Sequence, residues 1–198
     1  MFKKLAVALV FIISSVFLNT VSYSIEPDVF VQSTVNRAAD TLGGDLSKEE
    51  RIKKLKIIAK TTVDIYGIGM YSLGSNRKNL SKDELKTYND VFEKYFLKSF
   101  SSRLAEYSNP IIEVNSKEKI NNNYTIVSST LVATEKRPEI KIDWRIYTKN
   151  PEKPLIRDLI IEGLSLARTQ KEEFNSIIQG ANGDINALFD NLKNFSNN

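Results

Sequence analysis

The sequence from residue 143 to residue 174, DWRIYTKNPEKPLIRDLIIEGLSLARTQKEEF, decides the fold of this chain. Two runs rich in β-branched and aromatic residues, 139–148 and 155–162, flank the turn formers Asn150-Pro151 and predict a pair of strands. Thr169-Gln170-Lys171-Glu172 then has the form of a capping box, which predicts the start of a helix. The segment therefore reads as a hairpin followed by a helix, with no His or Cys in it.

The register of this hairpin follows from its apolar pattern. Placing Trp144 opposite Leu159 and Arg145 opposite Asp158 puts apolar and polar side chains on separate faces. The expected apolar face holds Ile142, Trp144, Ile146, Leu159 and Ile161. The expected polar face holds Asp143, Arg145, Tyr147, Ile156, Asp158, Ile160 and Glu162. We expect an Arg145–Asp158 cross-strand ion pair worth about 0.2–1 kcal/mol. The apolar face has two interpretations, an ordinary core under helices or the wall of a ligand cavity.

The residues before the hairpin predict helices first. Pro27–Leu42 is a plausible helix that ends at Gly43-Gly44, and capping boxes at 47–50 and 81–84 start two more. The Gly-rich stretch 67–74 between those two is expected to be flexible. The helix after the second box has the strongest periodicity, with apolar residues mostly three and four apart at Leu85, Tyr88, Val91, Phe92, Tyr95, Phe96, Phe100 and Leu104.

Two further strand-like runs, 111–119 and 124–134, precede the hairpin, and Asp184 is placed to cap a final helix. Short turns between the four runs favour an antiparallel meander. Strands packed on segregated helices make an α+β domain, and no repeat or linker divides residues 25–198. A curved antiparallel sheet of about four to five strands, wrapped by helices around an internal apolar cavity, resembles the NTF2-like architecture.

The first 24 residues predict a cleaved secretory signal peptide. Lys3 and Lys4 precede an apolar run, and Ser22 and Ser24 occupy the small positions of a cleavage site. The alternative is an uncleaved membrane anchor, for which the run is short because a bilayer needs about 20 apolar residues. Without Lys3 and Lys4, the 28 basic residues become 26 against 24 acidic, so the net charge falls to +2 and gives no reason to expect a nucleic-acid partner.

The composition excludes several kinds of catalytic site. With no His and no Cys, Ser-His-Asp and Cys-His nucleophile systems and the usual zinc or copper sites are absent. One enzymatic alternative remains, an NTF2-like enzyme in which Asp143, Asp158 or Glu162 acts as a base in an apolar cavity. The structural alternative, an ion pair of these acids with Arg145 or Arg157, is favoured because isolated acids rarely imply catalysis.

Several segments together resemble the MlaC family of periplasmic phospholipid carriers, also known for toluene tolerance. The resemblance is strongest over 143–184, in Asp143-Trp144-Arg145, the strand end Ile160-Ile161-Glu162-Gly163, the helix start at 170–174 and Gly183-Asp184. It is weaker at 69–72, where Ser stands in place of the family's Trp.

The resemblance implies a non-enzymatic carrier of diacyl phospholipid without metal or cofactor. It implies shuttling between an outer-membrane lipoprotein–porin complex and an inner-membrane ABC transporter, which maintains outer-membrane lipid asymmetry. The residues expected to line the lipid cavity are Tyr71, Phe92, Phe96, Ile142, Trp144, Ile146, Leu159, Ile161, Leu166 and Phe174. A charge at Ile161 or Leu166 is expected to abolish lipid retention and spare the fold. A periplasmic adaptor with a filled core is the third alternative, beside the carrier and the enzyme.

Overall fold

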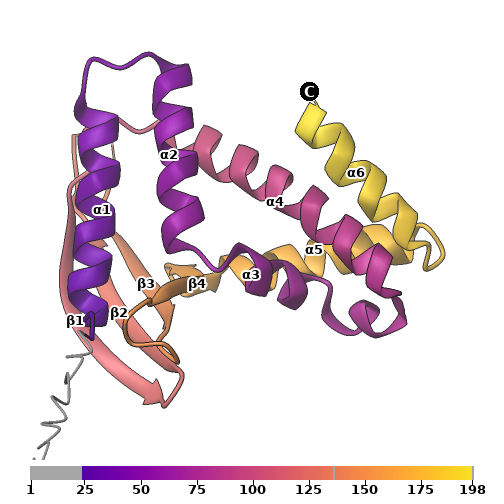
Figure 1. Cartoon of the computed structure of the whole chain (residues 1–198). Helices are drawn as coiled ribbons and strands as arrows, with labels where there is room; N and C mark the ends of the chain where they lie inside the picture. The colour runs from indigo at the N-terminus through magenta and orange to yellow at the C-terminus, as the bar shows by residue number, and fades with distance from the viewer. Residues whose placement is uncertain (1–23, 136, 198) are drawn as a thin grey trace, which may run out of the picture.

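The computed structural model describes residues 24–135 and 137–197 (Figure 1). The expected signal peptide therefore lies, except for its last residue, outside the described residues. Among those described, no helix is both long enough and apolar enough to cross a membrane. The helices are α1 (Pro27–Gly43), α2 (Lys48–Thr62), α3 (Ile65–Ser72), the 3₁₀ helix η1 (Gly74–Asn79), α4 (Lys82–Leu104), α5 (Leu166–Gly180) and α6 (Ile185–Asn197). The strands are β1 (Ile112–Asn121), β2 (Tyr124–Leu131), β3 (Ile140–Tyr147), β4 (Leu155–Ile161) and β5 (Leu164–Ser165).

The five strands form one antiparallel sheet in chain order, β1-β2-β3-β4-β5. This confirms the predicted α+β class and the antiparallel meander. The register of β3 and β4 is also confirmed, because Trp144 pairs with Leu159 and Arg145 with Asp158. Chain-order pairing follows from the short turns, which leave no length for a crossover connection.

A β-bulge in β4 corrects part of the predicted face. The register shifts between Arg145 and Ile146, so that Ile146 pairs with Ile156 and Arg157 is the extra residue. An extra residue reverses the alternation beyond it. Ile156 therefore lies on the apolar face and is 5% exposed, although strict alternation had placed it on the polar face.

The local sequence predicted the starts of α2 and α4 correctly, but not those of α3 and α5. Ser47 and Ser81 form complete capping boxes, as expected. The box at Thr169 was wrong, because the N-cap of α5 is Ser165, four residues before Thr169. The expected flexible stretch at 67–74 was also wrong: α3 occupies most of it, capped by Asp64, which accepts a hydrogen bond from Gly67 N at 2.8 Å.

The two faces of the sheet have different surroundings. The covered face packs against helices, with α1 lying along β1 and β2 (Figure 1). Its buried apolar residues are Val127, Leu131, Ile142, Trp144, Ile146 and Ile156. The open face consists of the side chains that alternate with these, namely Tyr124, Ile126, Ser128, Asp143, Arg145, Tyr147 and Asp158.

An aromatic cluster extends the core away from the sheet. Phe92 of α4 is 1% exposed and contacts the rings of Tyr88, Tyr95, Phe96 and Phe174 at centroid distances of 5.6–6.2 Å. Tyr88 donates its hydroxyl proton to the carbonyl of Gly69 at 2.9 Å, and burial raises the pKa of Tyr88. A Cβ at Gly69 would lie 2.7 Å from the Phe92 ring, so α3 can pack this closely only with glycine there.

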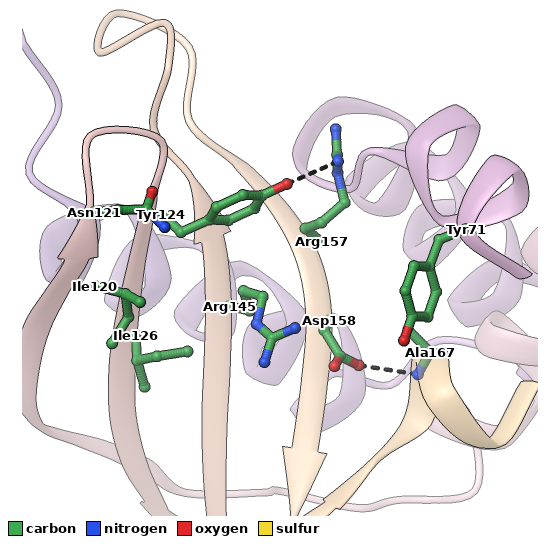
Figure 2. Close-up of a pocket in the computed structure, with 9 residues that line it drawn as sticks. All are labelled: Tyr71, Ile120, Asn121, Tyr124, Ile126, Arg145, Arg157, Asp158 and Ala167. Atoms are coloured by element: carbon green, nitrogen blue, oxygen red, sulfur yellow. Dashed lines mark hydrogen bonds between the residues drawn. The ribbon is translucent and has the colours of Figure 1, made fainter. Parts of the chain in front are cut away.

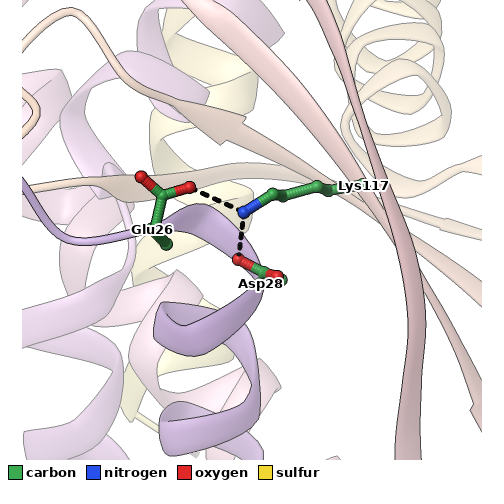
Figure 3. A network of polar contacts seen from close by, with 3 residues as sticks. All are labelled: Glu26, Asp28 and Lys117. Carbon is green, nitrogen blue, oxygen red and sulfur yellow. Dashed lines mark hydrogen bonds and ion pairs between the residues drawn. The ribbon is translucent and has the colours of Figure 1, made fainter.

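An exposed ion-pair network fixes the start of α1 to the sheet (Figure 3). Lys117 of β1 donates to Glu26 at 2.6 Å and to Asp28 at 2.8 Å. The lysine lowers the pKa of Asp28, mainly through its hydrogen bond. Exposed pairs of this kind contribute little stability, so the network sets the position of α1 more than it stabilises the fold.

Candidate functional site

A cavity of about 390 Å³ lies where the open face of the sheet meets α3 and α5 (Figure 2). The strands contribute side chains that alternate toward this face, and the helices contribute Tyr71 and Ala167. The cavity is lined by Tyr71, Ile120, Asn121, Tyr124, Ile126, Arg145, Arg157, Asp158 and Ala167. The lining combines apolar groups with charged and hydrogen-bonding groups, so it suits an amphipathic ligand.

Arg157, the bulge residue, joins the sheet to α3. Its Nη2 pairs with the carboxylate of Asp64, the N-cap of α3, and its Nη1 donates to the Tyr124 hydroxyl at 3.0 Å. The guanidinium also lies 4.5 Å from the centre of the Tyr147 ring, a cation–π distance. Arg157 is thereby a fixed wall of the cavity whose charge Asp64 compensates.

Asp158 has a structural partner other than the expected one. It is 4% exposed, and its two carboxylate oxygens accept hydrogen bonds from the Ser165 hydroxyl at 2.6 Å and from Ala167 N at 2.9 Å. No ion pair joins it to Arg145 in the described residues, so the predicted cross-strand ion pair was wrong although the register was right. Asp158 instead satisfies a free N–H at the start of α5, where a negative charge is favourable.

The apolar part of the cavity is built from two strands on one side and two helices, α3 and α5, on the other. Ile120 and Ile126 come from β1 and β2, and Tyr71 and Ala167 stand across from them. Lys171 of α5 lies 5.4 Å from the centre of the Tyr71 ring, which helps to hold this partly exposed side chain in place.

The ten residues predicted to line a lipid cavity lie in three settings. Tyr71 alone among them lines the cavity described above. Five are buried in the core, namely Phe92, Ile142, Trp144, Ile146 and Phe174. Phe96, Leu159 and Ile161 are half-buried, and Leu166 is 42% exposed at the first position of α5.

Sequence reasoning missed most of the cavity lining. Ile126 and Tyr124 alternate with the buried residues of β2, and that two-residue period is the signal that could have placed them on the open face. Arg157 and Ile120 carried no such signal, because each is the extra residue at a register shift, Arg157 in β4 and Ile120 between Lys119 and Asn121 of β1.

The described residues show no candidate metal site, and two of the three acids considered as bases have structural hydrogen bonds. Residues 24–135 and 137–197 contain no group of three or more His, Cys, Asp or Glu side chains arranged to hold a metal ion. Asp158 accepts hydrogen bonds from the Ser165 hydroxyl and from Ala167 N at the start of α5. Glu162 lies past the end of β4 and accepts a hydrogen bond from Lys141 N at 2.5 Å.

Comparison with known proteins decides the family. The model of the MlaC protein family matches residues 31–194, which is most of the chain. The chain belongs to the MlaC family. MlaC proteins are periplasmic phospholipid-binding carriers and not enzymes, which confirms the family expected from the sequence and removes the NTF2-like enzyme as an alternative.

Solved structures share the fold of this MlaC protein. One is the phospholipid-binding protein from Ralstonia solanacearum in complex with a phospholipid. It is 17% identical to this chain with a TM-score of 0.73, and the match covers 87% of this chain and 97% of that one. At this identity the similarity shows the fold alone. No curated protein matches the chain significantly in sequence.

Proposed function

We propose that residues 25–198, released from a cleaved signal peptide, form a single domain that carries glycerophospholipid through the periplasm. The proposed route runs between an outer-membrane lipoprotein–porin complex and an inner-membrane ABC transporter, and it maintains outer-membrane lipid asymmetry. One observation carries the proposal: a chain of the MlaC family has an amphipathic cavity beside an apolar core. The charge, near balance, leaves nucleic acid an unsuitable partner.

The physical reason for such a carrier is the cost of exposing acyl chains to water. Each CH₂ group transferred from water is worth about 0.8 kcal/mol, so two sixteen-carbon chains represent roughly 25 kcal/mol. A protein that shields the chains removes most of this barrier. The carrier needs apolar surface and no catalytic group, which agrees with the absence of His and Cys from the sequence.

The cavity is too small to hold both chains as it stands. Its volume of about 390 Å³ lies near the lower end of the ~300–1,000 Å³ that suits drug-sized ligands, which are smaller than a diacyl lipid. We infer that the chains extend from the cavity past α3 toward the aromatic cluster. Phe92 and Phe174 would then move apart and, with Tyr71, Phe96 and Leu166, border the lipid in this opened state. The five predicted residues of the sheet, Ile142, Trp144, Ile146, Leu159 and Ile161, point to its other face.

Lipid extraction tests the proposal directly. The chain is expressed with its own signal sequence, purified from the periplasm, and extracted with organic solvent for lipid mass spectrometry. Bound diacyl phospholipid in near-stoichiometric amount is the expected result. A protein that carries no lipid, and acquires none from phospholipid vesicles, would instead be the adaptor with a filled core.

Replacing Leu166→Asp tests the lining. Leu166 is 42% exposed at the first position of α5, where an acidic residue is favourable to the helix, so we expect the melting temperature to change by only a few degrees. Co-purifying phospholipid should fall at least tenfold, because a charge beside the cavity opposes entry of the acyl chains. Ile57→Asp, which makes a similar change at a 58% exposed position of α2, is the control and should retain its lipid. Equal lipid content in both variants would remove Leu166 from the lining.

A further inference from the structure

Three hydrogen-bond donors that line the cavity are not used by the fold. In the described part of the chain, the Arg145 guanidinium takes part in no hydrogen bond, ion pair or ring contact, although Arg145 is exposed on the open face and lines the cavity. The two other donors are on Tyr124 and Asn121, and their orientation follows from the bonds that each of them accepts.

The Tyr124 hydroxyl is oriented by Arg157. It accepts the proton of Arg157 Nη1 at 3.0 Å, which leaves its own proton available to donate to another group. The ring is held in place by Tyr147, whose centroid lies 5.4 Å away. The donor is therefore rigid before any ligand arrives, which lowers the entropy cost of using it.

The side chain of Asn121 likewise accepts one hydrogen bond within the fold and keeps its donor free. Its Oδ1 accepts a hydrogen bond from Asn123 N at 2.8 Å in the β1–β2 turn. Its amide NH₂ group remains to donate, and Asn121 pairs with Tyr124 across the hairpin. Figure 2 shows the side chains of Asn121 and Tyr124 close together at this end of the cavity, with Arg145 on the same side of the strands.

The acids near Arg145 are compensated or screened. Both oxygens of Asp158 accept hydrogen bonds at the start of α5, and Asp64 is paired with Arg157. Glu118, across β2 from Arg145, is exposed, and Asp143 lies two residues before Arg145 on the same face of β3. Charges near water are screened over about 8 Å at physiological salt, so neither cancels a direct contact to Arg145.

We propose that Arg145, Tyr124 and Asn121 bind the phosphodiester group that all glycerophospholipids share. This rests on the proposed lipid-carrier function and adds the part of the cargo that the protein recognises. Arginine and neutral N–H and O–H donors are well suited to phosphate oxygens. Ile120, Ile126 and Ala167 of the same cavity then contact the glycerol and the first methylene groups. The alcohol beyond the phosphate is left in water, so the carrier requires a phosphate and does not distinguish headgroups.

The test compares lipids that differ only in the phosphate. Lipid-free mature protein is mixed with vesicles containing fluorescent phosphatidylglycerol, phosphatidylethanolamine or diacylglycerol with identical acyl chains, and uptake is measured. The wild-type protein should take up both phospholipids at least tenfold better than diacylglycerol. Arg145→Gln should reduce phospholipid uptake about 10- to 100-fold, the range expected for one charge-assisted hydrogen bond, and leave diacylglycerol uptake unchanged.

Lys141→Gln is the matched control. Lys141 is exposed on the same strand and the same side of the sheet but does not line the cavity, so its replacement should leave the uptake of all three lipids unchanged. Equal losses for Arg145→Gln and Lys141→Gln, or equal losses of phospholipid and diacylglycerol, would overturn the phosphate site. Inorganic phosphate that competes as strongly as phospholipid would show that free phosphate is the ligand and would also overturn it. Failure of the wild-type protein to take up any lipid would instead refute the carrier function.

Discussion

The two faces of the sheet are made from the same strands, but one packs in the core and the other lines the cavity. On the covered face, Ile146 and Val127 are fully buried and Trp144 donates its indole proton to Ser129 Oγ at 2.8 Å. On the open face, neighbouring residues of the same strands border a cavity and keep donors free. A two-residue period therefore lets one strand supply stability on one side and a binding surface on the other.

The difference implies that stability and ligand binding respond to different substitutions. A fully packed side chain cannot be shortened without leaving a void, whereas a side chain at a cavity wall already faces space. Three predictions bear on this separation, beginning with the substitution pair that should show it most strongly.

The same substitution on the two faces should have unequal costs. Ile146→Ala removes a fully buried side chain and should lower the free energy of unfolding by about 2–5 kcal/mol. Ile126→Ala, at a half-buried position one strand away, should cost roughly 1 kcal/mol because less apolar surface is lost. Urea denaturation followed by tryptophan fluorescence measures both. Equal costs would mean that the open face is as tightly packed as the covered face.

Asp158 affects both stability and ligand binding, because it caps α5 and also lines the cavity. Asp158→Asn keeps the shape but weakens the bonds from Ser165 and Ala167, and should lower the free energy of unfolding by about 1–3 kcal/mol. It also removes a negative charge next to Arg145, so phospholipid uptake should stay equal or rise. Thermal unfolding and vesicle uptake are measured on the same sample. A variant that loses uptake while remaining folded would assign Asp158 to the ligand site itself.

The smallest effect is expected at the exposed Lys117 network, where β1 meets the start of α1. Because Lys117 lowers the pKa of Asp28 in the folded state, the stabilising contribution of Asp28 is complete above the unfolded pKa near 3.8. It is lost as the pH falls through the lower folded value. The loss is small because the pair is open to water. Stability measured between pH 2.5 and 5 should decrease slightly less steeply for Asp28→Asn than for the wild type. A steeper decrease in the variant would contradict this sign.

Most of the fold was predictable because its signals are local. Each of the capping boxes at Ser47 and Ser81 spans only four residues. The hairpin register follows from the alternation of apolar and polar residues around Trp144. Predictions failed where tertiary contacts override local signals. The Gly-rich start of α3 is held by Asp64 and by packing on Phe92, and the true cap of α5, Ser165, is itself bonded to Asp158.

The candidate site was less predictable than the fold. The apolar periodicity that identified Phe92, Trp144 and Phe174 is the same for a packed core and for a cavity wall, because both exclude water. Of the predicted lining residues, Tyr71 is the one that the structure brings to the cavity. The polar residues of the site, Tyr124 and Arg157, meet only after the strands have paired.

The sequence by itself determined most of the helices and strands, their order, the register around Trp144 and the resemblance to the MlaC family, since these depend on residues close together in the chain. Tertiary structure alone decided which face of the sheet the helices cover and which hydrogen-bond donors remain free. It also decided the position of the bulge in β4, which directs the Arg157 side chain to Asp64 and Tyr124. Arg157 meets Asp64 across 93 residues of chain and Tyr124 across 33. Such contacts depend on how distant segments pack together, and no local pattern of residues encodes that packing.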